Sequence, residues 1–327
     1  MAFNMSQLDY LRLKTQVDLD TLDLEAGAKL GPFSDLTSNQ WETYTELCKP
    51  EHQDLIVRSV ELTKEHRHRF PGLSKEEIAV EFCMVKLSLV GSQCVTGSVH
   101  IMANPLYAHS TQKIVETGKR FHQLARILDP AFDTSRIVMK VPATWEGLQG
   151  CRELNELGIK TLATTVFTFA QAVLAGEVGC TSISPFVHDL KLHIDGQTID
   201  DDPIFDLVVK AQAYYKASGI KTMVKACAVF DAAEALQLAG VDAFTLPAEI
   251  IQQLANKKAD AEQLMNQSMF SNPSVGMDYV QPLSFVCEEA KFRDAMANEG
   301  RGLEKTDEAI AIFSSFQKEL EDLMKEM

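Results

Sequence analysis

Hydrophobic and polar residues follow two different periods along this chain. Short apolar runs rich in β-branched residues predict buried strands, and the clearest are Arg136–Val141, Thr161–Phe167, Thr181–Val187, Thr222–Ala226 and Val241–Leu246. Longer amphipathic stretches between them predict helices, at Glu146–Leu157, Thr168–Gly176, Ile204–Ala217 and Asp231–Ala239. Glycines mark the points where these helices should end and turn back into strands, at Gly158, Gly179, Gly219 and Gly240.

The first third of the chain is less regular. Gln16–Leu19 is expected to be the first strand, a second lies near Asp35–Leu36, and Gln93–Val99 follows a predicted helix, Lys75–Leu89. Alternating helices and near-continuous apolar strands predict a parallel sheet with helical crossovers. Eight such units in about 250 residues favour a single (β/α)8 TIM barrel over an open sheet. No glycine-rich dinucleotide motif follows the first strand, which argues further against the open sheet.

The end of the chain is predicted to be helical. Residues 306–326 place apolar side chains on one helical stripe, within a C-terminal helical extension of about 283–327. This helix could cap the barrel, cover its mouth or pair with another subunit, so a homodimer stays open. No low-complexity or Pro/Gly-rich linker divides the chain, and we therefore expect a single domain over 1–327.

Charge and composition exclude several classes of partner. The net charge is −15, from 31 basic and 46 acidic residues, and no cluster of Lys and Arg appears. Nucleic acid and anionic membranes are therefore not expected as partners. No apolar run reaches eighteen residues, and the seven cysteines form no CxxC pair. We expect a cytoplasmic protein with reduced thiols, no metal site and no cofactor.

Lys140 is the candidate for chemistry. It stands near the carboxyl end of an otherwise apolar strand, and active sites of α/β barrels collect at that end. If Val138 and Lys140 share a face, the lysine points into the barrel, where burial favours the uncharged amine that attacks carbonyls. A lysine whose head reaches solvent at the strand end fits the same periodicity, which does not decide between the two.

The segment around Lys140 resembles the transaldolase family. Lys140–Gly147 (KVPATWEG) is similar to the family's Schiff-base segment, and two later signatures appear at Phe167–Ala172 (FTFAQA) and Ile183–Val187 (ISPFV). The resemblance is strong over residues 138–187 and extends more weakly over nearly the whole chain. It implies the same (β/α)8 barrel, a class I aldolase-type mechanism and a Schiff base on Lys140.

The resemblance also implies roles for other side chains. Asp20 would take the hydroxyl proton during carbon–carbon cleavage, with Asp18 as the competing choice, and Thr164 would hold a catalytic water. Substrate-binding side chains are implied at Asn39, Ser184 and Phe186. Gln40 stands where the family has a proline, so the loop after the second strand is expected to differ.

Other positions depart from the family pattern. The relay glutamate falls at or beside Gly97, and no carboxylate lies between Glu81 and Glu116. A substrate-binding asparagine falls at Leu162. The phosphate-binding arginine falls at Asp189, and the other phosphate-binding residues fall at Ala228 and Phe230.

These departures predict a changed substrate. Two like charges about 4 Å apart cost on the order of 4 kcal/mol at an effective dielectric of about 20, so Asp189 should repel a phosphate. We therefore expect poor use of fructose 6-phosphate and erythrose 4-phosphate. The predicted substrate is a small carbonyl compound that is unphosphorylated, or that carries an amine for Asp189 to bind.

The leading hypothesis is thus aldol or retro-aldol chemistry, with specialised metabolism as its setting. His100 or His188 could replace the missing relay glutamate, or each could be a partly exposed loop histidine. Lys225 could be a second barrel-lining amine, although an outward-facing position is favoured. Two alternatives remain: a true sugar-phosphate transaldolase of the pentose phosphate pathway, and a catalytically silent binding relative.

Overall fold

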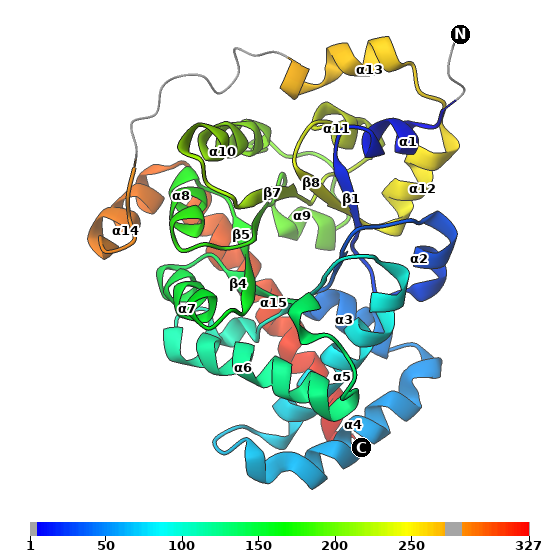
Figure 1. Cartoon of the computed structure of the whole chain (residues 1–327), viewed down its shortest axis with the longest axis vertical. Coiled ribbons are helices and arrows are strands. Elements are labelled where there is room, and N and C mark those ends of the chain that lie inside the picture. Colours follow the sequence, from blue (N-terminus) through cyan, green and yellow to red (C-terminus); the bar gives the residue numbers. More distant parts are fainter. Residues whose placement is uncertain (1–4, 272–282, 327) are drawn as a thin grey trace.

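Eight parallel strands form a closed barrel in which each strand pairs with the next in the chain and β8 pairs with β1 (Figure 1). The computed structural model describes residues 5–271 and 283–326. The strands are β1 Gln16–Leu19, β2 Leu36–Thr37, β3 Val99–Met102, β4 Ile137–Pro142, β5 Lys160–Val166, β6 Ser182–Pro185, β7 Met223–Ala226 and β8 Ala243–Leu246. The predicted TIM barrel is confirmed.

Helices surround the strands, as the crossovers of a parallel barrel require. The predicted helices correspond to α5 Lys75–Gly91, α7 Trp145–Glu156, α8 Phe169–Glu177, α10 Phe205–Ser218 and α11 Ala232–Gln237. The others are α1 Gln7–Arg12, α2 Leu24–Leu30, α3 Gln40–Leu47, α4 Gln53–His66, α6 Thr111–Leu128, α9 Leu190–Ile194, α12 Ala248–Asn256, α13 Ala261–Gln267, α14 Glu289–Asn298 and α15 Gly302–Lys325. No helix among the described residues is long and apolar enough to cross a membrane.

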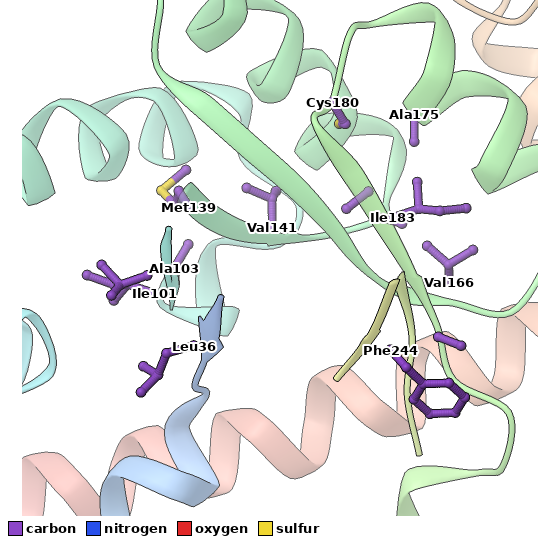
Figure 2. Close-up of a cluster of buried hydrophobic side chains, with 14 of the residues drawn as sticks. Leu36, Ile101, Ala103, Met139, Val141, Val166, Ala175, Cys180, Ile183 and Phe244 are labelled. Atoms are coloured by element: carbon purple, nitrogen blue, oxygen red, sulfur yellow. The ribbon is translucent and has the colours of Figure 1, made fainter. Parts of the chain in front are cut away.

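The outward faces of the strands carry the main core. Ile101, Met139, Val141, Ile183 and Phe244 are almost fully buried and belong to one large apolar cluster between strands and helices (Figure 2). Because side chains alternate along a strand, the neighbours of these residues point into the barrel. On β4 this alternation turns the residue between Met139 and Val141 inward, and that residue is Lys140.

Glycines end four of the predicted helices as expected. Gly158, Gly179, Gly219 and Gly240 have φ values of 73°, 77°, 69° and 121°. Backbones in this left-handed region favour glycine because a Cβ would be strained there. At Gly240 an added Cβ would also lie 2.8 Å from the Cβ of Phe270, so both the backbone conformation and the close approach of Phe270 require glycine here.

The third strand begins later than predicted. Ser92–Cys94 forms a 3₁₀ turn, and Arg136 donates hydrogen bonds to the carbonyls of Ser92, Val95 and Gly97. These bonds hold Val95–Gly97 as a loop, and β3 starts only at Val99. Gly97 therefore lies at the amino end of β3, away from the barrel mouth. The β3 residue in register with Lys140 is Met102, so Gly97 and Lys140 are not level in the barrel, and the relay position at or beside Gly97 stays a prediction.

The C-terminal helix covers the mouth of the barrel. α15 runs across the barrel (Figure 1), packing against α3, α5, α9 and the end of β5. Its Ala309 and Phe313 join Met102, Phe167 and Phe186 in a second apolar cluster at the mouth. Of the three uses open to this helix, covering the mouth is the one observed. In the expected extension 283–327, Met327 lies outside the described residues, as do residues 1–4 and 272–282 of the expected domain.

Candidate active site

A cavity opens at the carboxyl ends of the strands, beneath α15. About 680 Å³ lies between its walls, part of it open to solvent. Its lining comes from the ends of strands β1, β4 and β8, the starts of α3 and α9, the segments after β6 and β7, and α15. The described lining residues are Asp20, Asn39, Trp41, Glu42, Lys140, Phe186, Leu190, His193, Cys227, Ala228, Val229, Thr245, Pro247 and Phe313. Lys140, Asp20, Asn39 and Phe186, all chosen from the sequence, thus meet in one cavity.

Lys140 presents an unpaired amine to this cavity. The residue is 4% exposed, and its strand neighbours in register are Met102 and Leu162, which are both apolar. Among the described residues Lys140 forms no hydrogen bond or ion pair. A buried lysine without a carboxylate partner is suited to nucleophilic chemistry, since its nitrogen is not occupied by a structural contact.

Asp20 is held at the mouth by a short chain of hydroxyls. The Thr37 hydroxyl donates a 2.5 Å hydrogen bond to one carboxylate oxygen of Asp20, and lies 2.6 Å from the hydroxyl of Thr245. Both threonines are buried, so they fix the orientation of the carboxylate. Asp18 is not at the mouth. It is fully buried inside the barrel and pairs with Lys225, which leaves Asp20 as the carboxylate near Lys140.

Asn39 begins α3 and faces the cavity at the same time. Its side-chain oxygen accepts a 2.9 Å hydrogen bond from the backbone N–H of Glu42, an N-cap contact that fixes the first turn of the helix. Its amide nitrogen donates no hydrogen bond to any described residue and can bind a ligand. Gln40 follows, and its amide donates to the carbonyl of Ala103 at 3.2 Å and lies 3.4 Å from the side chain of Gln317 on α15.

Thr164 and Ser184 lie on the inner faces of β5 and β6. Thr164 is fully buried, and its hydroxyl has no hydrogen-bond partner among the described residues. A buried hydroxyl of this kind usually binds an ordered water or a ligand, as expected of a residue that holds a catalytic water. Ser184 is 2% exposed and lies outside the described cavity lining. The proposed roles of both residues stay predictions.

Asp189 is paired with the C-terminal helix. Its carboxylate lies 2.9 Å from the Lys305 ammonium and 3.5 Å from the Arg301 guanidinium, and Lys305 lies also 3.1 Å from Asp202. Asp189 does not belong to the described lining of the cavity. Because its charge is offset by these cations, its expected role in repelling a phosphate or binding an amine gains no support from its position.

A second set of charges fills the barrel below Lys140. The Lys225 ammonium is bound by Asp18 and lies 2.9 Å from Asp35. The Asp35 carboxylate also lies 3.1 Å from the ring of His100. The expectation that Lys225 faces outward is wrong: it is 1% exposed and inside the barrel. Burial, together with the charge of Lys225, lowers the pKa of His100 to about 4. His100 belongs to this network and is absent from the described cavity lining.

His188 is also outside the cavity. Its two ring nitrogens lie 3.0 Å from carboxylate oxygens of Asp200 and Glu234, and the ring stacks on Phe230 at 3.8 Å. Although burial opposes it, these two carboxylates raise the pKa of His188. The residue is 3% exposed, so the reading as a partly exposed loop histidine is also wrong. Both nitrogens are occupied, which leaves none for a substrate.

Three polar cavity residues were missed in the sequence: Glu42, His193 and Thr245. Burial raises the pKa of Glu42 to about 8, and the charges of Asp20 and Glu249 add to this rise. Burial lowers the pKa of His193, whose ring nitrogen lies 3.2 Å from the Ala228 carbonyl. Glu42 could have been found, because Asn39 followed three residues later by a glutamate is a helix-start pattern. That pattern would place Glu42 in a first turn beside the second strand.

The described residues contain no group of three or more His, Cys, Asp or Glu side chains placed to hold a metal ion. The polar groups at the mouth are instead arranged around one amine. Lys140, Asp20 and Glu42 bring a nucleophile and two carboxyl groups into a partly enclosed space with an apolar wall formed by Trp41, Phe186 and Phe313. Such a site can form an imine and move protons next to it.

Comparison with known proteins agrees with this geometry. Residues 17–327 match the Transaldolase/Fructose-6-phosphate aldolase family. A transaldolase of Alteromonas mediterranea is 29% identical over 328 residues, which cover 98% of each chain. A transaldolase of Schizosaccharomyces pombe is 28% identical over 328 residues, again with 98% of each chain covered. A transaldolase of Prochlorococcus marinus is 28% identical over 331 residues, covering 98% of this chain and 94% of the relative.

Proposed function

The chain belongs to the transaldolase/fructose-6-phosphate aldolase family, and on that premise we propose that Lys140 forms a Schiff base with an unphosphorylated carbonyl substrate. One observation carries this proposal above the others. The amine of Lys140 has no partner among the described residues, and it faces a cavity at the end of the barrel where chemistry collects in this fold.

The expected chemistry follows from the amine and the neighbouring carboxylate. The Lys140 nitrogen attacks the substrate carbonyl to give a carbinolamine, which loses water to give an imine. Asp20 then takes the proton of the hydroxyl on the β-carbon, counted from the imine carbon, and this oxygen becomes a carbonyl. The bond between the α-carbon and the β-carbon breaks. Its electron pair forms the carbon–carbon double bond of an enamine, and the electrons of the imine double bond move to the nitrogen. Thr37 holds the Asp20 carboxylate in one orientation for this step.

The charges around the cavity support an unphosphorylated substrate. Among the described lining residues Lys140 is the sole lysine or arginine, whereas Asp20 is an acidic residue beside it. The nearby Lys305 and Arg301 are already paired with Asp189, and a phosphate needs such cations free for charge-assisted hydrogen bonds. A substrate that carries an amine was expected because Asp189 could bind that amine. Since the Asp189 carboxylate is already paired with Lys305 and Arg301, this reason no longer holds.

A sugar-phosphate transaldolase is the second candidate, favoured by one observation. The relatives named transaldolase are similar to this chain over 94–98% of their length. A silent binding relative is the third, and it predicts that Lys140 reacts with no carbonyl. Specialised metabolism has no support from the fold, the site or the comparisons, and it forms no part of the proposal.

Borohydride reduction separates the three candidates. The purified protein is incubated with dihydroxyacetone, fructose or fructose 6-phosphate and reduced with borohydride. The mass of the intact protein is then measured by mass spectrometry, and Lys140→Arg serves as the matched control. The proposal predicts one adduct with the unphosphorylated compounds, absent from Lys140→Arg. Trapping with fructose 6-phosphate alone would establish the sugar-phosphate candidate, and no adduct with any compound would establish the silent relative.

A further inference from the structure

Imine formation at Lys140 needs an acid, and none of the residues implied by the family resemblance was assigned this role. The carbinolamine loses its hydroxyl as water only if a proton is delivered to that oxygen. Met102, the β3 residue in register with Lys140, has no ionisable group that could donate a proton. Neither His100 nor His188 belongs to the described lining of the cavity. The acid must come from a group at the mouth itself.

Resting on the proposed function, we propose that Glu42 is this missing acid–base residue, delivering and recovering the proton beside Lys140. Glu42 lines the same cavity as Lys140 and Asp20. The strand before it, β2, is separated from β4 in the barrel by β3 alone. It lies in the first turn of α3, directly after β2, where the chain leaves the carboxyl end of the barrel.

The start of α3 is fixed on several sides, so Glu42 is held in place. Asn39 accepts a hydrogen bond from its backbone N–H, and Gln40 is bound to the carbonyl of Ala103 after β3. Trp41, the residue before it, stacks on Phe316 of α15 with ring centroids 6.2 Å apart. A carboxyl group on a rigid turn can act repeatedly at one point without reorganisation, as acid–base catalysis requires.

The charges facing Glu42 come from four elements. Asp20 after β1, Glu249 at the start of α12 and Glu46 one turn along α3 are negative, whereas Lys140 of β4 is positive. His193 of α9 lines the same cavity, and burial lowers the pKa of its ring. Together with burial, the carboxylates raise the pKa of Glu42 to about 8, so the group keeps its proton at neutral pH.

The proton balance of the step is simple. Protonated Glu42 gives its proton to the carbinolamine hydroxyl, the C–O bond breaks, water leaves, and the nitrogen lone pair forms the iminium bond. The Glu42 carboxylate then takes a proton from the carbon next to the iminium carbon. The C–H electron pair forms the enamine, and Glu42 is again protonated. No other reagent is consumed.

Trapping kinetics test this role directly. The wild-type protein is incubated with dihydroxyacetone and enough cyanoborohydride that the rate no longer depends on hydride, so imine formation limits adduct growth. The rate is followed by intact mass between pH 6 and about 9.5, a range that brackets the Glu42 pKa of about 8. Glu42→Gln, Glu42→Asp and Glu249→Gln are compared, with Glu51→Gln as the control because that side chain is exposed and outside the cavity.

We expect Glu42→Gln to form the adduct roughly 100-fold more slowly, since a positioned acid typically contributes at least that factor. The wild-type decline above about pH 8 should be absent from this variant. Glu42→Asp should form the adduct faster than Glu42→Gln, and its rate should again fall at high pH. Glu249→Gln should move the decline to lower pH, because removing a like charge lowers the pKa of Glu42. Glu51→Gln should match the wild type.

Two results would overturn the inference, and they are distinguishable. If wild type and Glu42→Gln form the Lys140 adduct at the same rate and with the same pH dependence, Glu42 is not the acid and the proposed function stands. If the wild type forms no adduct with dihydroxyacetone, Lys140 does not form the proposed Schiff base. The proposed function is then wrong, and so is the acid–base role of Glu42.

Discussion

Lys305 of α15 lies 2.9 Å from Asp189 at the start of α9, and both side chains are buried. This ion pair ties the C-terminal helix to the barrel, at a position where the resemblance to the family implies a phosphate-binding arginine. The Asp189 carboxylate here holds the helix that covers the site, and Lys305 of that helix supplies the positive charge.

Lys305→Met should destabilise the protein, because it leaves the buried Asp189 carboxylate without its nearest cation. Breaking one side of a buried pair typically costs about 3–5 kcal/mol. The Asp189→Asn/Lys305→Met double variant should recover part of that loss, which a double-mutant cycle from urea unfolding measures. Lys325→Met removes an exposed pair and should cost less than about 1 kcal/mol. Equal effects at positions 305 and 325 would contradict the pairing.

The buried His100 should make the protein lose stability in mild acid. Its pKa is lowered from 6.5 to about 4, so between these values the unfolded chain binds a proton that the folded chain does not. The free energy of unfolding from this group is therefore fully present above about pH 6.5 and is lost as the pH falls toward 4. The loss is on the order of 3 kcal/mol at 1.36 kcal/mol per pKa unit.

His100→Gln should flatten that pH dependence relative to the wild type. Urea unfolding at pH 7, 6, 5 and about 4.5 gives the two slopes across the window set by the His100 pKa. His188 has a raised pKa and acts in the opposite direction in both proteins, so it cancels in the comparison. Parallel slopes in the wild type and His100→Gln would show that His100 titrates normally in the folded state.

Much of this fold follows from local pattern. The strands from β4 to β8 and their helices were correct because each strand is a buried apolar run and each helix ends at a glycine. β3 was misplaced because the predicted segment Gln93–Val99 contains three apolar residues, Cys94, Val95 and Val99. What makes it a loop is Arg136, which binds its carbonyls from far along the chain. The pairing of Asp189 with Lys305 is equally long-range, so reading Asp189 as a free charge failed.

The candidate catalytic residues could be predicted only in part, for a similar reason. Lys140 stands out because a lysine in an apolar strand is unusual, and the WEG segment beside it resembles a known site. Glu42 looks like an ordinary residue of a polar helix. Its direction depends on how α3 leaves β2 and on the α15 contacts of Gln40 and Trp41, which local pattern does not reveal.

Thr37→Val should separate imine formation from bond cleavage. It removes the hydroxyl that donates to Asp20, and a hydrogen bond to a charged group contributes about 1.5–3 kcal/mol. Cleavage of fructose to dihydroxyacetone and glyceraldehyde should therefore slow roughly ten- to a hundredfold. Borohydride trapping at Lys140 should be unchanged, since Thr37 does not contact that amine. An equal loss in both assays would assign Thr37 a general structural role.

The identity of the lysine that reacts decides whether Lys140 is the Schiff-base residue, and peptide mapping measures it directly. Two buried lysines lie on the described barrel strands. Lys140 has no partner among the described residues, whereas Lys225 is paired with Asp18 and Asp35. After reduction with borohydride in the presence of dihydroxyacetone, the protein is digested and the modified peptide is sequenced by mass spectrometry. We predict a single adduct on Lys140 and none on Lys225. An adduct on any other lysine, or none at all, would contradict the central claim.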